Sequence, residues 1–443
     1  MSAVDPARNS QRLLPNRLPH WIIALVVLTL FASIAEWRRM HPGGSTWLKM
    51  DQTDQIGAEY DTIAQAVRNG RGFADVFHRP TGPTAWMPPL LVYFTAGLYW
   101  IFQDDRGCVV TALWICKMAV LSYAAILFVN YCRNRGGGAA GCIILAVGLA
   151  SDFFELFQRT HDTWLIMLIV TITWHGLQRW PPQFRLVRIV GWGVFGGLAA
   201  LSGPIVGLAW AVTTSMFWIR QQAQHSGHAV SVKALAAIAT AAITSILVVT
   251  PWLVRNRVVM GRWIPIKSNG VYELWQSQVF DDDGVLDSIY AWKHPWGYNG
   301  FQRDEYARRG EIEFISSRWP ATWDSIVDRP SDFARRVSNR LFAAVWYYTP
   351  LNELDESLKW PIRFTRVYFC LPVLGLIIVL WRRQPLSDAA FIAICLYLTV
   401  LVPYILVSYY GRYAAPLTFM KMMLVYHGFE ALFCFFKRDS QCC

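Results

Sequence analysis

The chain has 443 residues, of which 54% are hydrophobic and 16% are charged, and its formal net charge is +11. A typical soluble chain carries about 25% charged residues, so the composition excludes an ordinary soluble domain and also disordered, collagen-like and coiled-coil classes. Nine cysteines without zinc-type spacing exclude a disulfide-stapled fold and a structural zinc site. Lipid is the solvent that suits these proportions.

Eleven apolar stretches predict an all-α polytopic membrane protein. They begin near residues 20, 86, 108, 139, 163, 188, 205, 234, 367, 389 and 414. Arginines precede the first stretch, and Lys437 and Arg438 follow the last. Because basic residues collect on the cytoplasmic side, both termini are expected to be cytoplasmic in a multi-pass protein of the inner (plasma) membrane.

Termini on the same side require an even number of crossings, so one stretch is expected to cross only partly. The candidates between residues 86 and 160 are the stretch that begins Trp86-Met-Pro-Pro and the short one that follows Gly136. Partial elements are tolerated where protein covers them. The sequence thus predicts about ten full spans and one partial span. The expected parts are an N-terminal transmembrane catalytic module (1–254) with a first outer loop (38–85), an outer helical loop facing the periplasm or exterior (255–365) and C-terminal transmembrane helices (366–443).

The first outer loop carries several acids beside a predicted amphipathic helix. Its residues 51–90 read DQTDQIGAEYDTIAQAVRNGRGFADVFHRPTGPTAWMPPL. Most exposed acids are simply solvated, which is the ordinary interpretation for any one of them. Glu59 and Asp61 stand two residues apart and cannot share a helix face. Asp54 is a further acid in the same loop.

A second acid, Asp162, begins a later apolar stretch in the segment QRTHDTWL (158–165). Such a residue can cap a helix, but an ionisable side chain at a membrane edge is also a functional candidate. Asp152 and Glu155 are alternatives nearby. We expect His161 to be a polar lining residue.

Cations also lie on the side predicted to be outside. TPWLVRNRVVMGRWIPIKSNGVYELW (250–275) contains Arg255, and VSYYGRYAAPL (407–417) contains Arg412. Such arginines can snorkel at the interface. Their planar fork also suits phosphate, which it can hold through two hydrogen bonds.

These segments, together with KHPWGYNGFQRDEYARRGEIEFISSRWP (293–320), resemble in their order the GT-C membrane glycosyltransferases of family 39 type. That group includes protein O-mannosyltransferases and lipid-A aminoarabinose transferases. The resemblance runs from about residue 50 to about residue 420. In the family, the loop after the first span carries a catalytic acid, usually Asp. EYDTIA (59–64) is similar to that string and puts Glu59 at the acid's position.

The resemblance implies a GT-C fold and transfer of a monosaccharide from a polyprenyl-phosphate donor to a lipid, glycan or protein acceptor at the outer face of the cell envelope. Glu59 is then the general base, with Asp54 or Asp61 in its place if the register differs, and Asp162 assists. The residues expected to bind the donor phosphate or the substrate are Arg255, Asn256, Arg412, Glu273 and His294.

No cofactor is expected, and nucleic acid is not an expected partner, whereas membrane lipids are. The two acids could hold a divalent metal, but no ligand cluster supports one. Two alternatives remain open. One is a lipid-linked sugar transporter or flippase, and the other is an inactive family relative that acts as an assembly subunit.

Overall fold

The computed structural model describes residues 19–40, 56–77, 80–153, 156–157, 161–226, 232–280, 283–286, 294–296, 300–346, 370–381 and 385–437. Within these residues the regular elements are helices, and β pairing is limited to two isolated bridges. The all-α prediction is confirmed for this part of the chain. Two of the acids weighed above, Asp54 and Glu155, lie outside the described residues.

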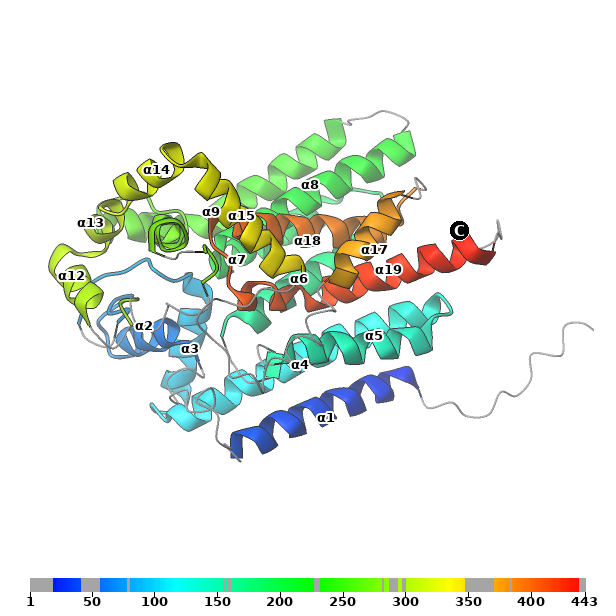
Figure 1. Ribbon diagram of the computed structural model, residues 1–443, viewed down its shortest axis with the longest axis horizontal. Helices are drawn as coiled ribbons and strands as arrows, with labels where there is room; N and C mark the ends of the chain where they lie inside the picture. Colours follow the sequence, from blue (N-terminus) through cyan, green and yellow to red (C-terminus); the bar gives the residue numbers. More distant parts are fainter. Residues whose placement is uncertain are drawn as a thin grey trace, which may run out of the picture.

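Apolar helices of 12 to 29 residues run side by side and form a bundle (Figure 1). They are α1 (His20–Met40), α4 (Arg106–Asn134), α5 (Gly138–Ser151), α6 (Thr163–Gln178), α7 (Leu186–Ser202), α8 (Pro204–Ser226), α9 (Val232–Met260), α17 (Cys370–Trp381), α18 (Asp388–Val407) and α19 (Thr418–Lys437). Among the described residues, α4, α9 and α18 are long and apolar enough to cross a membrane. Further apolar helices, including α5, α6, α7 and α17, are shorter.

The bundle exposes apolar side chains that a soluble protein would bury. Only 17% of the apolar window of α9 is buried inside the protein. On this helix Ile243, Leu247 and Val258 are 60%, 64% and 76% exposed. Leaving such groups in water costs about 25 cal/mol per Å² of apolar surface. The bundle surface therefore suits a lipid environment.

Further helices form a cap at one end of the bundle, mostly on the left of Figure 1, and the last of them (Pro330–Val345) reaches back over α18. They are α2 (Ala58–Arg68), α10 (Gly270–Trp275), the π-helix η5 (Gln276–Phe280), α12 (Phe301–Arg309), α13 (Glu311–Ser316), α14 (Trp319–Val327) and α15 (Pro330–Val345). Glu311 of α13 accepts hydrogen bonds from the Thr84 hydroxyl, the Ala85 backbone N–H (2.9 Å) and the Tyr306 hydroxyl (2.6 Å). These bonds join the two predicted outer loops into one layer.

The helix α3 (Pro89–Ile101) touches the cap at both of its ends. Just before it, Trp86 packs on Tyr272 of α10, with ring centroids 5.0 Å apart. Near its other end, the Tyr99 hydroxyl donates to Asp61 of α2 over 2.5 Å. Thirteen residues rise about 20 Å, about as much as the 14 residues of α5 and the 12 of α17. Contacts with cap residues near both of its ends, rather than its length, therefore place α3 beside the cap.

Candidate functional site

Five of the predicted site residues come together where the cap meets the bundle, and we call them the site cluster: Glu59, Asp162, Glu273, His294 and Arg412. They come from separate segments of the chain. Glu59 lies in the first turn of α2, Asp162 directly precedes α6, and Glu273 lies on α10. Arg412 lies on η6 (Gly411–Tyr413), a short 3-10 helix between α18 and α19.

Glu59 and His294 face each other inside the protein. They are 7% and 4% exposed, and the His294 Nε2 lies 4.0 Å from the Glu59 Oε1. Burial, together with a smaller effect of the positive charge of Arg412, lowers the pKa of His294 from 6.5 to about 3. The imidazole is therefore uncharged at neutral pH, so this contact is not an ion pair.

Tyr60 connects the two predicted catalytic acids. Its side chain is 4% exposed, and its hydroxyl donates to the Asp162 Oδ2 over 2.9 Å. Burial, followed by the charge of Asp162, raises the pKa of Tyr60 well above 10, so the phenol stays a neutral donor. Tyr60 follows Glu59 on α2, so one turn of helix positions both acids. Asp162 makes no side-chain capping bond to α6, so the simple N-cap alternative is not realised.

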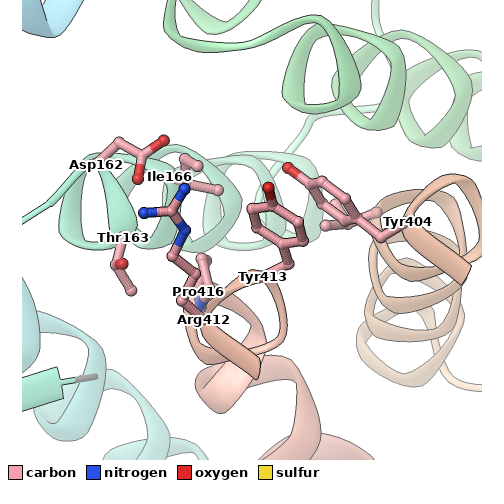
Figure 2. A pocket seen from close by; sticks show the side chains of 8 residues that line it. Asp162, Thr163, Ile166, Tyr404, Arg412, Tyr413 and Pro416 are labelled. Atoms are coloured by element: carbon pink, nitrogen blue, oxygen red, sulfur yellow. The ribbon is translucent and has the colours of Figure 1, made fainter. Parts of the chain in front are cut away.

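A small cavity lies beside Asp162 and Arg412 (Figure 2). Its volume of about 10 Å³ accommodates about one water molecule, so a sugar can enter only if lining side chains move. The Arg412 guanidinium lies over the ring of Tyr413, 5.5 Å from its centroid. Tyr413 in turn stacks on Tyr404 at 4.2 Å. The lining residues are Asp162, Thr163, Ile166, Val400, Tyr404, Arg412, Tyr413 and Pro416.

Glu273 approaches the same place from α10. Its Oε1 accepts from the Asn269 side chain over 3.2 Å, and its Oε2 accepts from the Ser408 hydroxyl over 3.4 Å. Burial raises the pKa of Tyr413 well above 10, and the negative charge of Glu273 adds to the shift, whereas Arg412 opposes it. Glu273 and Arg412 thus both act electrostatically on Tyr413, and Asp162 lines the cavity with Arg412.

Arg255 and Asn256 occupy a different place. Arg255 donates to the backbone carbonyls of Thr84 (2.7 Å) and Phe73 (2.6 Å). Asn256 is fully buried and donates to the carbonyl of Ile264 over 2.8 Å. We call Arg255, Thr84 and Glu311 the loop anchor, since they hold the first outer loop to the rest of the cap. The phosphate-binding roles of Arg255 and Asn256 stay predictions.

The alternative acid Asp61 is engaged in packing α2 on its neighbours. Besides the bond from Tyr99, it pairs with Arg106 at the start of α4 over 3.0 Å and accepts from Gln65 over 3.2 Å. As expected from the two-residue spacing, Glu59 faces the site cluster and Asp61 faces away from it.

Asp152 forms a buried ion pair that the sequence did not reveal. Lys421, in the first turn of α19, lies 2.9 Å from its Oδ2, and the Thr418 hydroxyl also donates to it, over 2.5 Å. The pair joins the end of α5 to the chain that follows Arg412. His161 instead packs under the start of α2, where a Cβ on Gly57 would lie 2.7 Å from its Nδ1.

Sequence reasoning also overlooked Tyr60, Tyr404 and Tyr413. Two of them could have been found from the sequence, because Tyr60 directly follows Glu59 and Tyr413 directly follows Arg412. Across the described part of the chain, no group of three His, Cys, Asp or Glu residues could hold a metal ion. The cofactor prediction itself remains untested.

Comparisons with protein-family models, with curated proteins and with solved structures found no match. The resemblance to GT-C glycosyltransferases therefore remains a prediction from the motifs.

Proposed function

We propose that this chain is an integral membrane glycosyltransferase of GT-C type, which moves a monosaccharide from a polyprenyl-phosphate donor to an acceptor at the outer membrane face. One observation carries the proposal. Asp162 and the cation Arg412, from distant segments, line one cavity of the bundle, and Tyr60, the neighbour of Glu59 on the cap helix α2, donates a hydrogen bond to Asp162 there. A lipid-borne donor needs such a junction, because its tail stays in the membrane while its head group reacts.

In the proposed reaction, Glu59 accepts the proton of the acceptor's nucleophile. The nucleophile attacks the anomeric carbon, and the bond from that carbon to the phosphate oxygen breaks, with its electron pair left on the phosphate. Arg412 donates to the phosphate as negative charge grows there. Asp162, held by Tyr60, orients a sugar hydroxyl.

The membrane placement is part of the proposal. The ten bundle helices cross, and α3 is the partial element between residues 86 and 160. Its contacts with the cap at both ends support this choice over α5. Arg135 follows the C-terminal end of α4, and Arg220 lies in the last two turns of α8, where it donates to the Leu386 carbonyl before α18. We place this end of the bundle on the cytoplasmic side under the positive-inside rule.

The test uses the whole protein purified into lipid nanodiscs and proteoliposomes. A radiolabelled polyprenyl-phosphate sugar and an envelope extract are supplied, and the label is followed into new glycosides. Covalent transfer that depends on the protein supports the proposal. Movement of intact labelled donor across proteoliposomes without transfer would favour the flippase, and absence of both would favour the inactive relative.

A further inference from the structure

We propose that Arg340 of α15 is a positioning residue, which fixes the end of α18 and thereby places Tyr404 and Arg412 at the cavity. The part that it plays in sugar transfer rests on the proposed function. Its physical content concerns the contact between α15 and α18, which can be tested without a sugar donor.

Arg340 is a fully buried cation. Its Nε donates to the Ile405 carbonyl over 2.7 Å, and its Nη2 donates to the Leu406 carbonyl over 3.1 Å. The side-chain oxygen of Gln278 on η5, in the amide orientation that its neighbours require, accepts from both terminal nitrogens over 2.9 Å. Burial, followed by the charge of Arg336, lowers the pKa of Arg340 to about 10, so the guanidinium stays charged at neutral pH.

The acceptors belong to the end of a helix, where carbonyls need partners from outside. α18 ends at Val407, and the last four carbonyls of an α-helix have no partner within the helix. The first of the four, on Tyr404, accepts from the Ser408 N–H, and Arg340 donates to the next two. The Ser277 hydroxyl of η5 donates to the fourth over 2.5 Å. Two elements of the cap thus complete the end of α18, and the cation also meets the negative end of the helix dipole.

The last turn of α18 forms part of the cavity wall. Tyr404, which directly precedes Ile405, lines the cavity and stacks on Tyr413 at 4.2 Å. The Arg412 guanidinium lies 5.5 Å from the centroid of the Tyr413 ring. A shift of the backbone at Ile405 would therefore move the ring on which Tyr413 rests, and with it the surroundings of Arg412.

The chain that connects α18 to Arg412 is held from the same side. Leu286, between η5 and α12, donates its N–H to the Tyr409 carbonyl over 3.1 Å. This contact is neutral, whereas Arg340 holds the helix end with a charged donor, and charge-assisted hydrogen bonds are roughly twice as strong as neutral ones. We therefore expect a change at Arg340 to displace the cavity wall.

The first experiment observes the cavity wall directly. The whole protein is labelled with 3-fluorotyrosine in nanodiscs, and the fluorine NMR signals of Tyr404 and Tyr413 are identified by their loss in the corresponding Tyr→Phe variants. Arg340→Lys should shift both signals, and Arg340→Gln takes its place if the lysine variant does not fold. The matched control is Arg335→Lys on the same helix, whose side chain is 52% exposed and should leave both signals in place. Unmoved signals in a folded Arg340 variant, or equal shifts in the control, would overturn the proposal.

The second experiment measures transfer per folded protein, at a temperature where the wild type and both variants are fully folded. Arg340→Lys should lower kcat about tenfold and leave the donor KM unchanged, because a misplaced Arg412 loses contact with the charge that develops in the transition state. Arg335→Lys should transfer at the wild-type rate. An unchanged kcat in folded Arg340→Lys would show that Arg340 only stabilises the fold. A wild-type protein that transfers no sugar would fail the proposed function, whereas the fluorine spectra would still decide whether Arg340 positions the cavity wall.

Discussion

The loop anchor and the site cluster contain the same residue types, yet they use them differently. In the loop anchor, Arg255 donates to two main-chain carbonyls and Glu311 accepts from three groups of the protein. In the site cluster, Arg412 and Asp162 line a cavity, and Glu59 faces its neighbour at 4.0 Å. Charged groups whose described bonds tie loops together hold structure, whereas charged groups that line a cavity are candidates to contact a ligand.

The largest expected contrast is between the two arginines. Arg412→Ala should reduce transfer about 100- to 1000-fold, as the loss of a donor to a developing anion typically does, with little change in thermal stability. Arg255→Ala should instead lower stability by about 3 kcal/mol, because two carbonyls lose a charged donor. Transfer rates, thermal unfolding and donor binding are measured for both variants. If a stable Arg255→Ala variant bound the donor more weakly, Arg255 would be a phosphate-binding residue, and the contrast between the two arginines would be wrong.

Glu311→Ala tests the loop anchor from its acidic side. Removal of this carboxylate leaves donors from Thr84, Ala85 and Tyr306 without their acceptor, at a cost of about 3 kcal/mol. Thermal unfolding in nanodiscs measures the loss. The matched control is Glu313→Ala on the same helix, whose side chain is 66% exposed and should change stability little. Equal losses of thermal stability in the two variants would show that the bonds of Glu311 do not stabilise the cap.

Acid should destabilise the fold through His294. Its pKa is about 3 in the folded protein against 6.5 when exposed, so the unfolded chain binds the proton first as the pH falls. The stability contribution is therefore complete above about pH 6.5 and declines toward pH 3, by up to about 2 kcal/mol between pH 7 and pH 5. His294→Gln should lose less stability over that range than the wild type. A variant with the same acid sensitivity would contradict the burial of a neutral ring.

The smallest effect concerns two phenol hydroxyls that each donate to an acid. Tyr60→Phe releases Asp162 and should slow transfer about tenfold, which corresponds to the loss of roughly one hydrogen bond. Tyr99→Phe releases Asp61 and should lower stability without slowing the reaction. Steady-state transfer and thermal unfolding of both variants are compared. Similar slowing in the two variants would mean that Tyr60 has no special relation to the site.

Hydrophobic pattern predicted the apolar helices, and spacing predicted that Glu59 and Asp61 diverge on α2. Sequence order also indicated that acids and Arg412 lie on one side of the bundle. The partners of Arg255 could not be predicted, because main-chain carbonyls more than 150 residues away carry no sequence signal. The sequence also could not decide whether α3 or α5 is the proposed partial element, because the contacts of Trp86 and Tyr99 with the cap are tertiary.

The most direct measurement is sugar transfer by Glu59→Gln, which removes the proposed base but keeps its size. The whole protein in nanodiscs is given labelled polyprenyl-phosphate sugar and an envelope extract, with Glu313→Gln as the matched substitution on the exposed cap surface. We predict that Glu59→Gln folds and transfers at least about 100-fold more slowly, whereas Glu313→Gln transfers at the wild-type rate. A folded Glu59→Gln protein that transfers at the wild-type rate would contradict the assignment of the site.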